Sequence, residues 1–249
     1  MRYIPLICNM ALTDNLVSYW KLDESSGTRI DSNGSNDLTE LGTGGVGSAT
    51  GIVSNGADFE RNDQDRLRIP STSFSGLGFS TVCSFSFWIK FESLSTDNTF
   101  IGRWKSGGNL SYLVHYNNTL NDLYFRNSST GSNNDAAFGN FTPSVGVWYH
   151  LVVTFSSGNC TFYVDGSDVT NDSTTSLTSC YTSSTADLML GNNEAATTLG
   201  FDGVMDEVGV WSRVLTSSEV TELYNAGTGL TYPFSSAATP TLMMMGIGS

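Results

Sequence analysis

The amino-acid sequence predicts an all-β protein in which two antiparallel sheets pack face to face as a sandwich, with one short helix on the C-terminal side. Several short segments alternate apolar and polar residues, which is the period of a half-buried β-strand. Only 14% of the 249 residues are charged, well below the usual share of about a quarter, so long helices lack their common Glu, Lys and Arg. Stretches rich in Gly, Ser and Asn separate the alternating segments and favour turns.

The clearest alternation is CSFSFWIKF at residues 83–91. One phase of this segment consists of Cys, Phe and Ile, and we expect it to face the layer between the sheets. The segment VWYHLVVTFSSGNCTFYVDG, residues 147–166, predicts two strands joined by a polar break and followed by an Asp-Gly turn. Its core face is expected to hold Tyr149, Leu151, Val153, Phe155, Cys160, Phe162 and Val164.

Eight further segments complete about eleven predicted strands. Each combines β-branched or aromatic residues with an alternating pattern. In chain order they are residues 16–22, 57–59, 66–70, 99–104, 111–116, 122–127, 187–191 and 201–211.

One helix is predicted from LTSSEVTELYNAG at residues 215–227. Thr216 and Glu219 have the spacing of a capping box, in which each side chain satisfies a backbone N–H of the first turn. Val220, Leu223 and Tyr224 form an apolar stripe, and Gly227 suits the left-handed position that ends a helix.

The charge balance argues against nucleic acid and membrane partners. The net charge is −13, from 24 acidic and 11 basic side chains, and no cluster of Lys and Arg offers the charge that phosphate binding needs. The four cysteines form no CxxC pair, so a zinc ribbon is not indicated. We expect Cys83 and Cys160 to be buried thiols, and a Cys160–Cys180 disulfide remains an alternative.

Both chain ends differ from the regular pattern. We expect an N-terminal arm at residues 1–11, one domain at 12–232 and a C-terminal arm at 233–249 that includes TLMMMGIGS. The first residues, MRYIPLICNM, lack the long apolar centre and the cleavage site of a secretory signal peptide.

Six separated motifs carry a family resemblance. They are LVSYWKLDESSGTRIDSNGSNDL, GIVSNGADF, FSFWIKF, WYHLVVTFSSGNCTFYVDG, LMLGNN and FDGVMDEVGVWSRVLTSSEVTELY. Their order over residues 12–230 resembles that in laminin G-like domains of the concanavalin A-like lectin/glucanase superfamily. The resemblance implies a jelly roll of two antiparallel sheets, a concave face where relatives bind sugars or proteins, and a late helix packed against the sandwich edge.

The resemblance also implies one structural calcium ion. In DSNGSND, Asp31, Asn33, Asn36 and Asp37 offer the hard oxygen donors that calcium prefers. Asp206 would join Asp31, Asn33 and Asn36 from across the sandwich, as the resemblance suggests. The alternative is a plain turn in which these side chains bind the backbone or water.

The sequence lacks the carboxylate pattern of the related glucanases. Retaining glycosidases place two carboxyl groups about 5–5.5 Å apart, and in those glucanases they follow a Glu-x-Asp-x-x-Glu pattern that no Glu of this chain begins. Asp206 and Glu207 are adjacent, so an extended strand directs them to opposite faces. A hydrolase is therefore the weakest of three functional interpretations.

An aromatic ligand platform is the remaining candidate site. Trp88, Trp148, His150 and Tyr163 lie on the phase opposite to the core face, and Trp104 is expected in a loop. Such rings stack on the C–H faces of sugars. The alternative is packing under a loop or a neighbouring subunit, with His150 forming a structural hydrogen bond.

We therefore expect a non-enzymatic structural or interaction module. Stand-alone chains of this kind resemble bacteriophage virion components such as head decorations, fibres and tail accessories. In that interpretation the terminal arms bind neighbouring virion subunits, because Met side chains fill irregular grooves, and a homo-oligomer is a further option. The alternative is a soluble, extracellular or cell-surface lectin that binds glycans.

Overall fold

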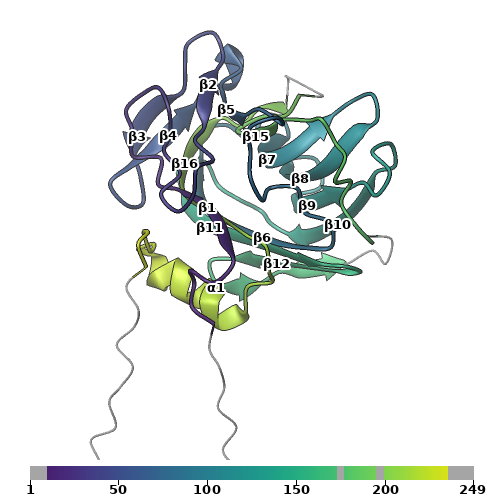
Figure 1. The fold of residues 1–249 in the computed structure, drawn as a ribbon. Coiled ribbons are helices and arrows are strands. Elements are labelled where there is room, and N and C mark those ends of the chain that lie inside the picture. The colour runs from purple at the N-terminus through teal and green to yellow at the C-terminus, as the bar shows by residue number, and fades with distance from the viewer. Residues whose placement is uncertain (1–9, 173–176, 195–198, 235–249) are drawn as a thin grey trace, which may run out of the picture.

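The computed structural model describes residues 10–172, 177–194 and 199–234, which form two packed eight-stranded sheets (Figure 1). Every pairing between strands is antiparallel. The first sheet has the order β13-β12-β11-β6-β16-β4-β3, with β1 paired to β16. Its strands are β1 (Leu16–Trp20), β3 (Gly47–Thr50), β4 (Asn55–Phe59), β6 (Val82–Phe91), β11 (Trp148–Ser156), β12 (Asn159–Val164), β13 (Ser167–Asp168) and β16 (Gly203–Trp211).

The second sheet has the order β14-β10-β9-β8-β7-β15-β5-β2. Its strands are β2 (Thr39–Leu41), β5 (Arg66–Ile69), β7 (Asn98–Lys105), β8 (Asn109–Asn117), β9 (Asp122–Asn127), β10 (Asp135–Asn140), β14 (Thr170–Asp172) and β15 (Leu188–Leu190). This arrangement confirms the predicted two-sheet sandwich, and all eleven predicted strands are present. The additional strands are short or rich in small residues, which is why alternation did not reveal them.

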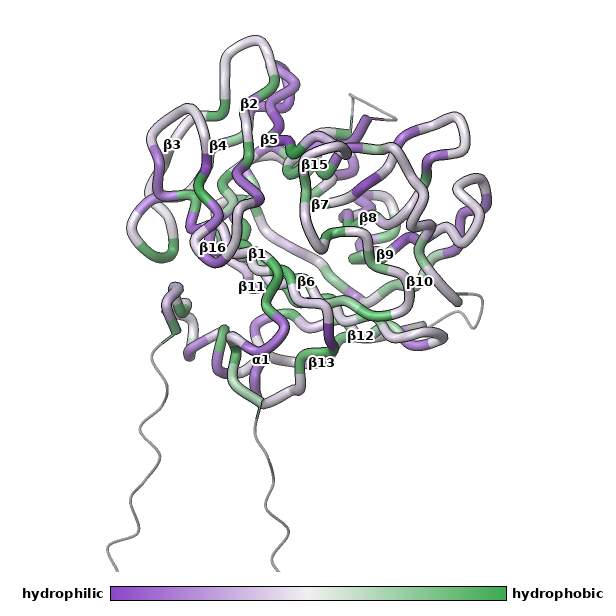
Figure 2. The backbone as a smooth tube through the Cα atoms, viewed as in Figure 1, coloured by the Kyte–Doolittle hydropathy of each residue, from purple (hydrophilic) through white to green (hydrophobic). Residues whose placement is uncertain are grey.

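The core lies between the two sheets and confirms the predicted inner faces. Phe85, Phe87, Leu151 and Phe162 are completely buried in it. Hydropathy alternates along the paired strands (Figure 2), as expected when successive side chains point to opposite faces. Cys83, Cys160 and Cys180 are buried with free thiols, so the alternative Cys160–Cys180 disulfide is absent.

The centre of the outer face of the first sheet is also buried, because α1 (Ser217–Tyr224) lies across it (Figure 1). Val152 of β11 and Trp211 of β16 are fully buried there in a second apolar cluster, together with Val220 and Leu223 of the helix. The strands of this sheet are therefore packed on both sides, which explains why every residue of β16 is buried.

The helix begins as predicted and ends earlier than predicted. Thr216 and Glu219 form a complete capping box. The left-handed residue that ends α1 is Asn225, with φ 48°, while Gly227 lies at the end of the following 3₁₀ turn with φ 89°. Asn tolerates the left-handed region better than most residues, so it ends the helix two residues before the predicted glycine.

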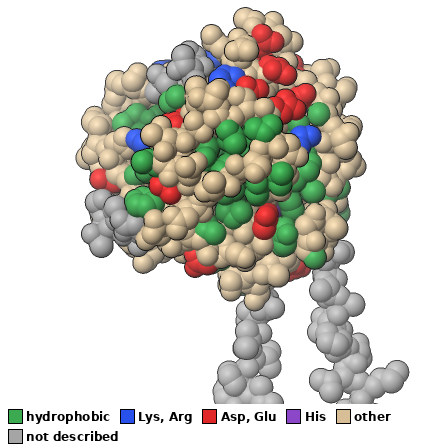
Figure 3. Space-filling model, turned by 180° about the vertical axis from the view of Figure 1, so that it is seen from behind, with side chains coloured by type: hydrophobic (Ala, Val, Ile, Leu, Met, Phe, Trp, Pro, Cys, Tyr) green, Lys and Arg blue, Asp and Glu red, His purple; other side chains and the backbone are tan. Residues whose placement is uncertain are grey.

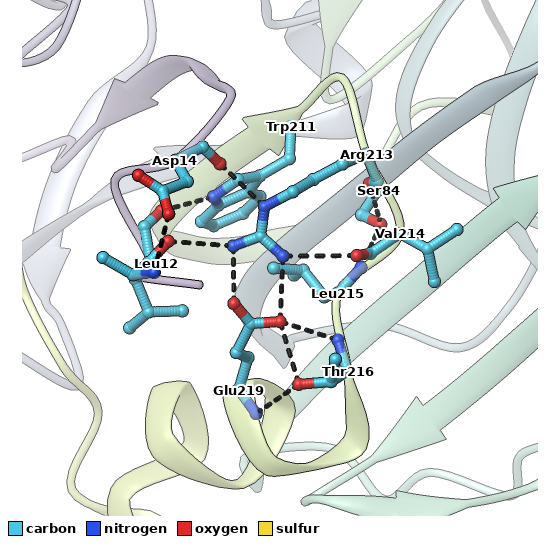
Figure 4. Close-up of polar contacts among 10 residues, drawn as sticks. Leu12, Asp14, Ser84, Trp211, Arg213, Val214, Leu215, Thr216 and Glu219 are labelled. Atoms are coloured by element: carbon cyan, nitrogen blue, oxygen red, sulfur yellow. Dashed lines mark hydrogen bonds and ion pairs between the residues drawn. The ribbon is translucent and has the colours of Figure 1, made fainter. Parts of the chain in front are cut away.

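Arg213 links the helix, the end of β16 and the start of the domain (Figure 4). Its terminal nitrogens donate to both carboxylate oxygens of Glu219, at 2.8 and 2.6 Å. Its Nε donates to the carbonyl of Asp14 at 2.7 Å, and one terminal nitrogen donates to that of Ala11 at 3.0 Å. These contacts hold α1 and the first described residues against the outer face of the first sheet.

Packing extends slightly beyond the predicted domain limits of 12 and 232. Ala11 binds Arg213 as described, and the ring of Phe234 lies edge-on to Tyr19 with centroids 5.2 Å apart. Most of each predicted arm lies outside the described residues. Within the described part of the chain, no helix has the length and apolar character needed to span a bilayer.

Glu219→Gln is expected to lower the free energy of unfolding by roughly 3 kcal/mol, because it leaves the buried charge of Arg213 without its partner. Burial raises the pKa of Glu219, but hydrogen bonds from Arg213 and Thr216 outweigh burial and hold it below the usual value. The stabilisation is therefore present at neutral pH and is lost as the pH falls through the lowered pKa. Urea unfolding at pH 7 and at acidic pH should show the difference between wild type and variant shrinking in acid.

Glu222→Gln is the matched control, because Glu222 is exposed on the same helix. Its free energy of unfolding should stay within about 0.5 kcal/mol of wild type. Equal stability of Glu219→Gln and Glu222→Gln would contradict a stabilising role for the Arg213–Glu219 pair.

Candidate ligand-binding site

Two of the predicted platform residues are packed inside the molecule. Trp88 of β6 is 3% exposed and His150 of β11 is 1% exposed. The rings of Trp88, His150 and Tyr224 of α1 form a cluster, with centroids 5.0 Å apart for Trp88 and His150, 5.7 Å for Trp88 and Tyr224, and 6.1 Å for His150 and Tyr224. Nε2 of His150 is 2.8 Å from Oγ of Ser86, and burial lowers the pKa of His150 to about 3. These two side chains therefore pack under the helix and present no surface to a ligand.

The other three predicted platform residues do not lie together. Trp148 is partly buried on the first sheet, with Nζ of Lys90 5.3 Å from its ring centroid. Tyr163 packs against the apolar cluster beneath α1. Trp104 is in β7 of the second sheet and not in a loop, and it is 8% exposed. Bulges in β7 interrupt its alternation, and that irregularity hid the strand position of Trp104.

The outer face of the second sheet carries two rows of cross-strand neighbours. Side chains directly opposite one another in an antiparallel pair lie about 5 Å apart, so each row is a continuous line of contacts across the strands. The first row runs Phe138, Tyr124, His115 and Thr99 across β10, β9, β8 and β7. The second row runs Ala136, Arg126, Leu113, Gly102, Met189 and Arg68 across β10, β9, β8, β7, β15 and β5.

Two adjoining cavities open on this face. We name them the aromatic cavity, of about 140 Å³, and the arginine cavity, of about 250 Å³, and together they form the groove. Asn193 lines both cavities. The aromatic cavity is otherwise lined mainly by Thr99, Trp104, Leu113, His115, Arg126 and Asp97. The arginine cavity is lined mainly by Arg66, Arg68, Asp187, Met189 and Glu194.

Aromatic rings continue from the aromatic cavity along the first row. His115 and Tyr124 stack with centroids 5.2 Å apart and an angle of 24° between their planes. Tyr124 and Phe138 follow at 5.6 Å and 33°. Tyr124 and Phe138 are only partly buried, so this strip offers ring surface beside the polar groups of the groove.

Arg126 and His115 form the main polar contact of the aromatic cavity. Nε of Arg126 donates to Nε2 of His115 at 2.9 Å. Burial and the charge of Arg126 lower the pKa of His115 to about 3, so the imidazole is neutral and accepts at Nε2. Sequence reasoning missed this group, although the alternation of SYLVHY and DLYFRN places His115 and Arg126 on the face opposite to the core.

The predicted calcium-binding turn is held by its own backbone. Oδ1 of Asp31 accepts from the amides of Tyr19 and Asn33 at 3.0 and 3.1 Å, and Oδ2 accepts from the amide of Asn36 at 3.0 Å. The side-chain oxygen of Asn36 accepts from the amide of Ser75 at 2.7 Å, and the side-chain nitrogen of Asn33 donates to a carbonyl. These donors point at the oxygens that an ion would need, so the residues fit a self-supporting turn and not a calcium shell.

Asp206, the fourth predicted ligand, has a similar environment. Oδ2 accepts from the amides of Ile52 and Val53 at 2.8 and 3.0 Å, and Oδ1 accepts from the amide of Glu207 at 2.8 Å. Burial raises the pKa of Asp206 to about 8. Three backbone amides therefore already occupy the oxygens of Asp206, and calcium binding stays a prediction.

A separate group of carboxylates, Asp58, Glu60 and Glu92, has ligand atoms within 4.8 Å of one another. Burial raises the pKa of each of the three, and the charge of nearby carboxylates, Asp202 among them, raises it further. Glu60 and Glu92 are exposed, and exposed carboxylates commonly gather without an ion, so we assign this group no function.

The two packed sheets and the groove define a lectin-like jelly-roll domain. The chain belongs to the concanavalin A-like lectin/glucanases superfamily, whose family model matches residues 61–221. This match confirms the family resemblance and lies within the predicted domain. No curated protein sequence matches the chain.

Solved structures with the same fold include two kinds of protein. Domain 4 of an extracellular arabinanase from Geobacillus stearothermophilus, solved with arabinotriose, is 22% identical with a TM-score of 0.64, and the match covers 84% of this chain and 97% of that one. The binding domain of Paraclostridial Mosquitocidal Protein 1 is 18% identical with a TM-score of 0.66, covering 87% and 53%. This chain thus spans about half of that toxin domain, and both likenesses show the fold alone.

Asp31→Ala is expected to lower the free energy of unfolding by about 3 kcal/mol, since three backbone amides lose their acceptor. The loss should be the same in excess calcium and in excess chelator, measured by calorimetric melting. The calcium prediction itself requires the wild-type melting temperature to differ by several degrees between these conditions. Coincident wild-type curves would contradict it.

Proposed function

We propose that the chain is a non-enzymatic carbohydrate-binding domain whose ligand lies in the groove of the second sheet. The observation that carries the proposal is the groove itself, which joins aromatic rings to amide and guanidinium donors. Sites for small ligands combine apolar walls with a few placed polar groups in this way. The helix α1 covers the centre of the outer face of the first sheet, whereas no helix lies across the outer face of the second sheet in the described chain (Figure 1).

The surface charge argues against nucleic acid as the ligand. The net charge is −13, and in the view from behind the acidic side chains are spread over the face while Lys and Arg are isolated (Figure 3). Binding to a phosphate backbone depends on many clustered cations. Sugars need instead a few donors and acceptors beside an aromatic ring, and the groove supplies both.

The carboxylates near the groove are not arranged for hydrolysis. Asp187 is 3.4 Å from Arg68, and Glu194 is 2.9 Å from Lys105. A glycosidase needs one carboxyl group that holds and donates a proton, and an ion pair with a cation opposes that state. Asp206 and Glu207 have raised pKa values of about 8 and 7, caused mainly by burial, but they lie beneath the surface of the other sheet.

The solved relatives support a binding role without establishing it. The arabinanase domain of the same fold was solved with arabinotriose, and the toxin regions are described as binding domains. This proposal therefore places the chain among the sugar-binding members of its superfamily and not among the glucanases.

Tyr124→Ala and Phe138→Ala are each expected to weaken glycan binding about tenfold, which corresponds to the loss of about 1.4 kcal/mol of ring stacking. The ligand is first identified on a glycan array, and affinities are then measured by calorimetry. Both side chains are partly exposed, so the variants should keep the wild-type melting temperature within a few degrees.

Trp148→Ala is the matched control, because it removes a partly buried ring from the first sheet. Its affinity should equal that of wild type. Binding that is lost in Trp148→Ala and retained in Tyr124→Ala would place the ligand on the first sheet, and no binding on a broad array would contradict the function.

The narrower role as a virion component also stays a proposal, together with the alternatives of an extracellular or cell-surface location. It depends on the terminal segments, of which residues 1–9 and 235–249 lie outside the described structure. Its support is the composition of TLMMMGIGS, since flexible Met side chains adapt to irregular partner surfaces.

Deletion of residues 235–249 tests this role. The described packing ends at Phe234, so the truncated domain should melt at the wild-type temperature and still bind glycan. Its incorporation into particles should be lost, as measured by the protein content of purified virions. Normal incorporation of the truncated chain would contradict anchoring by this segment.

A further inference from the structure

We propose that the groove selects an acidic oligosaccharide, one whose sugar rings carry a carboxylate, and that Arg126 binds this carboxylate. The inference rests on the proposed glycan-binding function and names the ligand class. Uronic acids and sialic acids share this chemistry. Three observations carry it: the free donors of Arg126, its fixed orientation, and the pairing of the carboxylates around the groove.

Arg126 presents unused hydrogen-bond donors to the aromatic cavity. Its Nε donates to His115. Within residues 10–172, 177–194 and 199–234, Arg126 belongs to none of the ion pairs, and its two terminal nitrogens donate no hydrogen bond. A guanidinium offers a planar fork of donors that matches a carboxylate. The fork of Arg126 is therefore available to a ligand.

His115 and Tyr124 fix the orientation of that fork. Arginine has no acceptor, so Nε2 of His115 must accept and Nδ1 must hold the proton. The low pKa of His115, about 3, keeps this arrangement unchanged near neutral pH. The guanidinium carbon of Arg126 also lies 5.5 Å from the centroid of the Tyr124 ring. His115 is thus a positioning residue, because it acts on the ligand through Arg126.

The carboxylates that line the groove are mostly neutralised. Asp187 pairs with Arg68 and Glu194 pairs with Lys105. Asp97, the remaining one, is turned towards the β8–β9 turn, where Oδ1 accepts from the amide of Asn118 at 2.9 Å. Asp97 and Asp122 lie near Tyr124 as well, but neither forms an ion pair with Arg126 in the described part of the chain.

Among the described residues, few other arginines have both terminal nitrogens unused as hydrogen-bond donors. Most of the other arginines are bound to carboxylates or carbonyls within the fold. A ligand could bind such an arginine only after that contact is broken. These contacts are Arg29 with Glu40, Arg61 with Asp202, Arg213 with Glu219, and Arg103 with the carbonyls of Ser184 and Ala186.

The second cross-strand row gives the groove its length. It crosses four strand spacings between Arg126 and Arg68, or about 19 Å at roughly 4.8 Å each. Gly102 lies in its middle, where a Cβ would come within 2.7 Å of Cδ1 of Leu113 and 2.8 Å of the carbonyl of Tyr112. Leu113 therefore packs directly against Gly102, and the row ends at Arg68, with Arg66 beside it in the arginine cavity. A row of this length suits an oligomer better than a single sugar.

Calorimetry with the full chain compares oligogalacturonate with its methyl ester, which keeps the rings and removes the charge. Wild type should bind the acid about tenfold more tightly at low salt, the gain expected of one charge-assisted pair. The ratio should fall as salt rises, because the contact is partly exposed. A second arm, sialyllactose against lactose, tells a sialic acid site from a uronic acid site.

Substitutions test which residues cause the preference for the acid over the ester. Arg126→Gln should reduce the acid-to-ester affinity ratio to about one, and His115→Phe should reduce it while His115→Gln, which keeps an acceptor, restores part of it. A purely structural role of His115 would lower both affinities and leave the ratio unchanged. Lys90→Gln, which removes one charge from the first sheet, should keep the wild-type ratio.

The possible results distinguish acid selection from glycan binding itself. Equal affinity of wild type for acid and ester, and for sialyllactose and lactose, overturns acid selection and leaves glycan binding in place. No binding in any arm, or to any neutral glycan, overturns both proposals. An unchanged ratio in Arg126→Gln shows that another group binds the carboxylate and overturns the assignment.

Discussion

The packing of α1 against the first sheet constrains the rest of the structure. The inner face of this sheet contributes to the core, and the centre of its outer face lies under α1 and the first described residues. Burying apolar side chains stabilises a fold by about 25 cal/mol per Å², so the helix is not easily displaced. Arg213 adds a directional link, since it joins Glu219 of the helix to the carbonyls of Asp14 and Ala11. The helix thus covers the centre of this outer face, which is why we propose the second sheet as the ligand-binding one.

The inner face could be predicted from the sequence because alternation has one physical cause, a strand with one buried face. The same alternation does not say what covers the opposite face. Trp88 and His150 lie on the face of their strands that is opposite to the core. That face is exposed to solvent only where no other element packs against it. The capping box of Thr216 predicted α1 but not its resting place, because contacts such as Trp88 with Tyr224 join residues far apart in sequence.

The groove was harder to predict, because it depends on register. His115 and Arg126 become neighbours only when β8 and β9 pair with His115 opposite Tyr124 and Leu113 opposite Arg126. A shift of one residue would send both side chains into the core face. Trp104 follows a bulge that no alternation reveals. Likewise, an Asp-rich turn suits calcium or its own backbone equally well in sequence, and only the amide directions around Asp31 distinguish the two.

The net charge of −13 does not oppose the proposed selection of an acidic sugar, because electrostatic forces in salt solution act only over short distances. At physiological salt the Debye length is about 8 Å, so most of the negative surface is screened from a ligand in the groove. The nearest charge then dominates, and Arg126 acts at contact distance, where the attraction between two charges is strongest. The long-range field should mainly slow association. Affinity for the carboxylate therefore depends on how firmly His115 and Tyr124 hold one guanidinium, and not on the net charge of the protein.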